Sequence, residues 1–201
     1  MIIVDGTKSA SSIATFENLE QALVSIMQDE KMENRVITDV LVNDEAFSEI
    51  YPHQAEDITC DAISCLEVRS VPNSELAVDI AGEMGKVATI MEHGARHVAR
   101  LFREASDTDG LELLQDLLDV TRDFMNMLGD LRGRYAEEDS FGFAEKTETL
   151  SALISEMSAV LENEDWILLA DLLEYEFMPL CAQWRTVSEQ MHQQIVRCVA
   201  Q

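Results

Sequence analysis

The spacing of the hydrophobic residues changes at Val71-Pro72-Asn73-Ser74, and this change constrains the fold more than any other feature. Before it, short apolar stretches separated by turn-forming residues predict β-strands. After it, apolar residues recur every three and four positions almost to the end, which predicts long amphipathic helices. The first such stripe comprises Ala77, Ile80, Met84, Val87, Met91, Gly94, Val98, Leu101 and Ala105. We therefore expect an α+β protein with a small β-rich module over 1–71 and an all-helical part over 72–201.

Local signals in the first part predict several strands and one helix. Asp5-Gly6 supplies the positive φ angles that a tight hairpin turn requires. Asn18 lies three residues before Gln21, a capping-box spacing that starts a helix. The expected elements are strands over 1–4 and 7–13, a helix from Leu19, a strand over 36–42, an irregular stretch through Tyr51-Pro52, and a strand over 63–71 in which Leu66 and Val68 share a face.

This order of elements resembles the β-grasp, or ubiquitin-like, fold. Some small β-grasp proteins carry sulfur or join to targets through a free C-terminal Gly-Gly. In this sequence the last strand runs into Val71-Pro72 and further protein, with no Gly-Gly at that point. The resemblance therefore implies a binding module or a structural cap, and no carrier role.

The second part is expected to form an antiparallel four-helix bundle. Asn73 or Ser74 is expected to cap the first helix, which runs to about Ala105. Gly94 lies on its apolar stripe, which suggests the close approach of a neighbouring backbone. The other helices are expected over 111–131, over 143–161 and from Trp166 onward, with a break at Glu137-Glu138-Asp139-Ser140 and a kink at Pro179.

One segment of the last helix resembles other proteins. Asp171–Leu180, followed by Trp184, is similar to a segment of uncharacterised bacterial proteins that also join a small β module to helices. That group implies no activity, cofactor or partner for this chain.

The balance of acidic and basic residues limits the classes of partner that the chain can bind. The chain has 39 Asp and Glu against 14 Lys and Arg, a net charge of −25, which repels nucleic acid and anionic membrane surfaces. Such a field favours cationic partners, and solubility alone also accounts for it. The four cysteines, the absence of a secretion leader at the start and the lack of a long apolar run predict a cytoplasmic protein with reduced thiols.

A stripe of basic residues on the first long helix is the candidate partner-binding site. It comprises His93, Arg96, His97, Arg100 and Arg103, which helical spacing places on one broad face. Arginine is scarce in this chain, so the stripe predicts a docking patch for an acidic partner or a small anion. The alternative is a solvated face, because Glu92 and Arg96, and Arg100 and Glu104, are spaced for ion pairs within the helix.

Glu189 and His192 have the Glu-x-x-His spacing of carboxylate-bridged di-metal bundles. Such sites need this motif on two helices. A second copy starting at Glu92 is missing, because the residue three positions later is Ala95 and not a histidine. No phosphate-binding loop, nucleophile elbow or zinc-protease motif is present in the sequence, so no cofactor and no catalytic residues are predicted.

These observations favour a non-enzymatic protein–protein interaction module, such as an adaptor or an export chaperone. Ten methionines, spread over the helices, would suit a groove for varied partners or simply fill the core. The alternatives are a metal-dependent bundle enzyme using Glu189 and His192, and an acidic nucleic-acid mimic. A homodimer through exposed apolar residues such as Leu113, Ile167 and Leu172 is also an open alternative.

Overall fold

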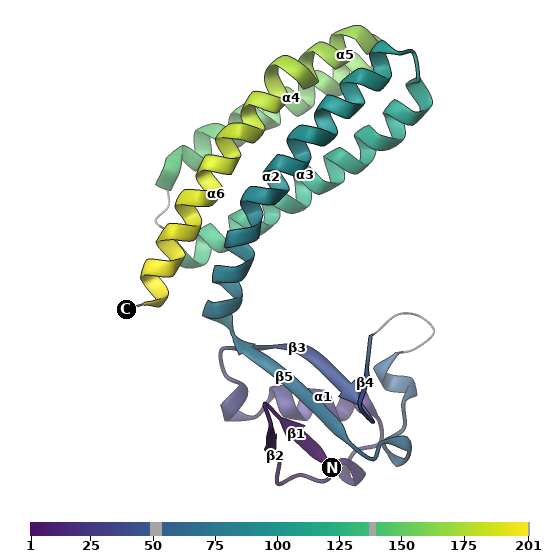
Figure 1. Ribbon diagram of the computed structural model, residues 1–201, viewed down its shortest axis with the longest axis vertical. Helices are drawn as coiled ribbons and strands as arrows, with labels where there is room; N and C mark the ends of the chain where they lie inside the picture. Colours follow the sequence, from purple (N-terminus) through teal and green to yellow (C-terminus); the bar gives the residue numbers. More distant parts are fainter. Residues whose placement is uncertain (49–53, 137–139, 201) are drawn as a thin grey trace. The chain divides into compact units, whose positions relative to one another are not determined.

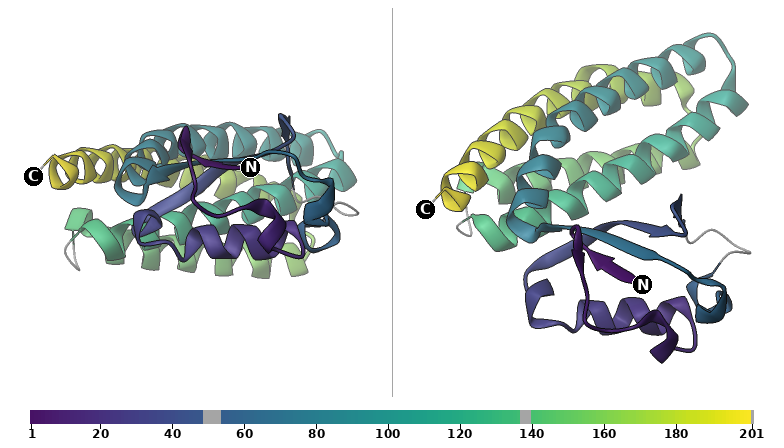
Figure 2. Two further views of the ribbon diagram at one scale, coloured as in Figure 1. Left: turned by 90° about the horizontal axis from the view of Figure 1, so that it is seen from below. Right: turned by 60° about the horizontal axis from the view of Figure 1, so that its bottom comes forward.

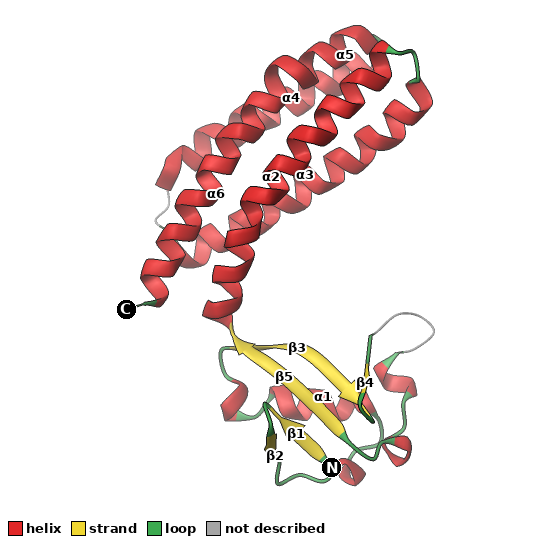
Figure 3. Ribbon diagram, in the orientation of Figure 1, coloured by secondary structure: helices red, strands yellow, loops and turns green. Residues whose placement is uncertain are grey.

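The computed structural model describes residues 1–48, 54–136 and 140–200 and divides into two compact units, Met1–Leu76 and Ala77–Gln201. The strands of the described residues all belong to the first unit, and the second is helical (Figure 3). The α+β organisation, a sheet followed by helices, is therefore confirmed. The predicted irregular stretch at Tyr51-Pro52 and the acidic break at 137–139 lie outside the described residues.

The N-terminal unit is built on a five-stranded sheet with the order β2-β1-β5-β3-β4. Its strands are β1 (Ile2–Val4), β2 (Thr7–Lys8), β3 (Arg35–Val42), β4 (Glu45–Ala46) and β5 (Leu66–Pro72) (Figure 1). The central strands β1 and β5 are parallel, and the other neighbours are antiparallel. A parallel pair needs a crossover connection, and the segment between them includes the helix of this unit.

Two tight turns close the hairpins at the edges of the sheet. Asp5 and Gly6 have φ angles of 47° and 75°, as their sequence predicts. Asn43 and Asp44 have φ angles of 53° and 69° and form a second hairpin, so that β4, which is missing from the sequence prediction, pairs with β3. The strand expected over 7–13 is wrong beyond Lys8, because Ile13 is buried in the core from a short 3₁₀ turn.

Helix α1 (Leu19–Met27) lies across one face of the sheet (Figure 2). Asn18 caps it by accepting a hydrogen bond from the backbone N–H of Gln21 at 3.0 Å. The reciprocal half of the predicted capping box differs, because the Gln21 side chain accepts from the N–H of Glu17 and not of Asn18. Buried apolar residues join the helix to the sheet, including Leu19, Ala22, Ile26, Ile2, Leu66 and Val68. Leu66 and Val68 are both buried, as their shared face predicts.

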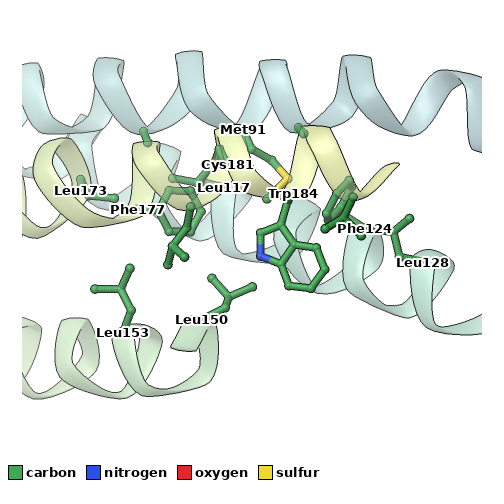
Figure 4. Close-up of a cluster of buried hydrophobic side chains, with 14 of the residues drawn as sticks. Met91, Leu117, Phe124, Leu128, Leu150, Leu153, Leu173, Phe177, Cys181 and Trp184 are labelled. Carbon is green, nitrogen blue, oxygen red and sulfur yellow. The ribbon is translucent and has the colours of Figure 1, made fainter. Parts of the chain in front are cut away.

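The second unit consists of helices, most of them long, that run alongside one another (Figure 1). They are α2 (Asn73–Arg103), α3 (Asp107–Tyr135), α4 (Phe143–Glu162), α5 (Trp166–Leu172) and α6 (Met178–Val199). Trp184 is buried in their core, where Phe124 lies beside it (Figure 4). The rings of Phe124 and Phe143 are edge-to-face against Trp184 at centroid distances of 6.3 and 5.2 Å. Such aromatic pairs stabilise a core beyond the area they bury.

Three local predictions about α2 need correction. The helix begins at Asn73 itself, directly after β5, and the buried Asn73 Oδ1 has no hydrogen-bond partner in the described part of the chain, so it does not cap. At the other end α2 stops at Arg103, and Ala105 is exposed with a φ of 57°. The residue that approaches Gly94 is the side chain of Leu117, 3.4 Å from where a Cβ would lie, and not a backbone.

The sequence predicts a kink at Pro179, and the structure has a π-helical turn, Leu173–Phe177, shortly before that residue, between α5 and α6. Proline has no N–H to donate to the preceding turn and its ring crowds the carbonyl four residues earlier. The wider turn lies directly before the proline, and Leu172 and Met178 on either side keep helical dihedral angles. The chain therefore passes Pro179 without leaving the helix.

Candidate functional site

The basic stripe lies on the exposed side of α2, and its residues His93, Arg96, His97, Arg100 and Arg103 are all exposed. Both ion pairs predicted within the helix are present: Arg96 contacts Glu92 at 3.1 Å, and Arg100 approaches Glu104 at 3.9 Å. These pairs offset the charge that would attract an acidic partner.

Arg103 is held by a different element. Its Nη2 lies 2.7 Å from Asp171 of α5 and 2.8 Å from Glu174 of the π-helical turn. Each arginine of the stripe thus has a carboxylate partner, and two of these carboxylates were not anticipated because they are distant in sequence. The stripe as a docking patch stays a prediction, now for a surface whose positive charge is largely balanced.

The Glu-x-x-His motif does not converge with other ligands. Glu189 is exposed, whereas His192 is half-buried and its Nε2 lies 3.6 Å from where a Cβ of Gly82 would be. Among the residues that the structure describes, no group of three or more His, Cys, Asp or Glu is placed to hold a metal ion. The arrangement gives the histidine a packing role against a glycine of α2.

The buried thiols and most methionines belong to the core. Burial, assisted by the charge of Glu92, raises the pKa of Cys181 to about 12, and burial also raises the pKa of Cys60. Neither thiol is therefore a thiolate near neutral pH, the form that acts as a nucleophile. Four methionines of the helical unit are buried, namely Met84, Met91, Met157 and Met191, which favours the core-filling interpretation.

The apolar residues proposed for a dimer contact divide into different environments. Leu172 is 4% exposed, so this part of the prediction is wrong, because the residue faces the core. Leu113 is half-buried and packs against the core, whereas Ile167 is 57% exposed. One residue of the three remains open on the surface.

An accessible apolar groove of ≈ 420 Å³ lies between α3 and α4 in the helical unit. Leu118 and Met125 of α3 and Ile154 of α4 line it, and all three are only partly buried. On α4, Thr147, Ser151 and Ser155 face the groove at four-residue intervals. Their side chains are too short to fill the space between the helices, so the apolar walls stay accessible. We call this surface the α3–α4 groove.

A second groove, of ≈ 560 Å³, lies on the other side of α4, between it and the start of α6. Leu153 and Leu180 form its apolar base. Its rim carries the carboxylates of Glu145, Glu148, Glu156 and Glu176, none of which has an ion-pair partner in the described part of the chain. We call this surface the acidic groove. Helix α4 is therefore open on two sides.

Sequence reasoning did not identify these grooves, although part of the signal was present. The repeat of small polar residues at Thr147, Ser151 and Ser155 marks one side of the expected helix over 143–161. The repeat could not indicate which helix packs beside it, because the pairing of helices is decided by tertiary structure. The four glutamates of the rim come from two elements, so their convergence also depends on the fold.

Comparison with known proteins finds one family model that matches each part of the chain. Residues 1–71 match a family described as Domain of unknown function (DUF8043), and residues 79–187 match Domain of unknown function (DUF8042). No curated protein and no solved structure matches the chain. Within the described residues, no helix is long and apolar enough to cross a membrane. Because its match covers more than half of the chain, the second family is the one to which this protein belongs, that of the domain of unknown function DUF8042.

Proposed function

We propose that this protein is a non-enzymatic protein–protein interaction module, an adaptor or an export-type chaperone, whose helical unit binds an amphipathic helix of a partner. The observation that supports this most is that α4 has an accessible apolar groove on each side. A helix laid into such a groove buries an apolar stripe spaced at three and four residues, a common mode of peptide recognition.

The charge around α4 specifies the chemistry of the partner helix. The unpaired carboxylates of Glu145, Glu148, Glu156 and Glu176 favour lysine or arginine on the flanks of the bound helix. The net charge of −25 would also speed the encounter with a basic segment. The partner segment is therefore apolar on one face and basic at its edges.

We also propose a finer description of the two units. The strand order β2-β1-β5-β3-β4, the parallel central pair and the helix on one face support a β-grasp relationship for the N-terminal unit. The alternating course of α2, α3, α4 and the α5–α6 segment supports an up-and-down four-helix bundle. The bacterial origin suggested by the segment Asp171–Leu180 remains part of this proposal.

The proposal can be tested with synthetic helices instead of an unknown partner. One peptide of about 18 residues carries a leucine stripe and lysine flanks, a second keeps the stripe with glutamate flanks, and a third scrambles the first. Fluorescence anisotropy with the full-length protein should show saturable binding of the lysine peptide only. Equal binding of the scrambled peptide would show attraction to net charge alone and would contradict the proposal.

Matched variants separate the grooves from the rest of the surface. Ser151→Trp fills the α3–α4 groove and should weaken binding by about tenfold or more. Thr186→Trp places the same side chain at an exposed position of α6 outside the grooves and should change the affinity less than about twofold. Equal effects of the two tryptophans would place the binding surface elsewhere.

Charge substitutions need the same kind of control. Neutralising Glu145, Glu148 and Glu156 together to glutamine should weaken binding of the lysine peptide far more than the triple variant Asp79→Asn, Glu112→Gln and Glu189→Gln. Both variants remove three carboxylates from exposed positions of the helical unit. If they weaken binding equally, the rim of the acidic groove has no special role.

A further inference from the structure

The N-terminal unit contains a cavity of ≈ 260 Å³ that the proposed function does not use. It borders β2, at the edge of the sheet, and reaches α1 and the short turn after it. Five apolar side chains contribute to its lining: Ile2, Val4, Phe16, Ile26 and Met32. Such a surface takes up the apolar part of a small ligand.

The basic residues of this unit are distributed in an uneven way. Residues 1–76 carry fifteen acidic side chains and only four basic ones, Lys8, Lys31, Arg35 and Arg69. Arg35 is paired with Asp5 at 3.1 Å, and Arg69 with Glu67 at 2.9 Å. Both lysines line the cavity instead, and neither has an ion-pair partner in the part of the chain that the structure describes.

The rim of the cavity adds further hydrogen-bond donors. Ser9, Ser11 and Ser25 line it, and none of their hydroxyl groups donates a hydrogen bond to another described residue. Ser25 differs in this from Thr89 of α2, a helical residue whose hydroxyl donates to the carbonyl four residues earlier. Two lysines and three serines that line the cavity therefore have hydrogen-bond donors not used by other described residues.

Two carboxylates also line the cavity, and both are engaged. Asp5 accepts hydrogen bonds from the backbone and hydroxyl of Ser70, both at 2.7 Å, and is paired with Arg35. Asp29 accepts from the backbone N–H of Lys31 at 3.0 Å. The charge of Asp5 is balanced by its arginine, so the two lysines outweigh the single remaining carboxylate.

From this combination we infer that the cavity binds a small anion, a carboxylate or a phosphate monoester, that bears a short apolar chain. The apolar chain would lie on the side chains from β1 and α1, and the anion would meet Lys8 and Lys31 at the rim. The volume admits about nine non-hydrogen atoms, at about 30 Å³ for each atom of the size of a water molecule. This site lies in a different unit from the grooves and does not depend on them.

Methyl-detected NMR of the full-length protein tests the inference with defined probes. Hexanoate and hexyl phosphate represent the two anionic sources, hexanol lacks the charge, and acetate lacks the chain. We expect saturable shifts of the methyl signals of Ile2, Val4 and Ile26 with at least one of the six-carbon anions. Hexanol and acetate should bind about tenfold more weakly or not at all. Equal binding of hexanol would refute the anionic specificity, and no response to either six-carbon anion would refute the site.

Variants identify the groups responsible. Lys8→Gln combined with Lys31→Gln should weaken binding of the anion by about tenfold or more. Arg69→Gln removes a charge from the same unit outside the cavity and should change the affinity less than about twofold. Ser25→Leu fills the cavity without changing the charge and should abolish binding, while unchanged methyl signals of Leu66 and Val68 show an intact fold. Binding that survives in the lysine variant, or is lost equally with Arg69→Gln, would overturn the assignment.

Discussion

Two glycines of α3, Gly110 and Gly129, should respond to the same substitution with opposite signs. A Cβ at Gly110 would lie 2.8 Å from Cε1 of Phe102, closer than carbon atoms normally approach. Phe102 is 2% exposed and stacks on Trp166 with a centroid distance of 5.4 Å, so its ring has little room to move. A Cβ at Gly129 would have no heavy atom within 4 Å. Both residues lie inside the helix.

The magnitudes follow from two opposing effects. Replacing glycine by alanine inside a helix stabilises it by up to about 1 kcal/mol, because the unfolded chain loses freedom. Overpacking a core side chain costs about 1–3 kcal/mol. For Gly129→Ala only the first effect acts, so the free energy of unfolding should rise by about 0.5–1 kcal/mol. For Gly110→Ala the second should prevail and lower it by about 1–2 kcal/mol.

Tryptophan fluorescence during urea denaturation measures this difference selectively. Both tryptophans of the chain, Trp166 and Trp184, belong to the helical unit, so the signal reports that unit alone. A separation of about 2 kcal/mol corresponds to about 1 M urea between the two midpoints. The double variant Gly110→Ala, Phe102→Leu should be more stable than the sum of the single effects predicts. If the two alanine variants had equal midpoints, the packing of Phe102 against Gly110 would not exist as described.

Two further predictions concern titratable groups. The hydroxyl of Ser70, together with its backbone N–H and Arg35, holds the pKa of Asp5 below its usual value. The stability that this carboxylate confers is therefore present above pH 4 and is lost as the pH falls through the lowered pKa. Urea titrations followed by methyl NMR of the N-terminal unit should therefore show a loss between pH 5 and about pH 2 that is smaller in Asp5→Asn; an unchanged profile would contradict this role. The pKa of Cys181 is raised to about 12 and the residue is buried, whereas Cys198 is exposed. Maleimide at neutral pH should therefore modify Cys198 first, which mass spectrometry can measure. Early modification of Cys181 would show that the core opens.

Much of the fold was predictable because it depends on local signals. The change of period at Pro72, the turn at Asp5-Gly6 and the cap at Asn18 each reflect the chemistry of a few adjacent residues. The errors arose where contacts between residues distant in sequence determined the local structure. Ile13 left the expected strand because the core takes its side chain. The turn that leads into β4 is held by the distant Ser64 and Cys65, whose backbone N–H groups donate to Oδ1 of Asn43.

The candidate sites were less predictable for the same reason. The residues singled out by motif, the basic stripe and Glu189 with His192, are explained largely by ion pairs and packing. The residues that line the grooves and the cavity carry no motif. Lys8 and Lys31 are unremarkable in the sequence, and only the fold shows that they border one cavity without carboxylate partners.

The sequence by itself determined the two-part organisation, the long helices, the burial of their apolar stripes and the strongly negative charge. These properties follow from residue type and spacing, which act over one or two turns of chain. Tertiary structure alone decided the order of strands in the sheet, the carboxylates that neutralise Arg103, the open sides of α4 and the cavity beside β2. Each of these depends on which surfaces meet, and surfaces meet through the packing of residues that are far apart in the chain.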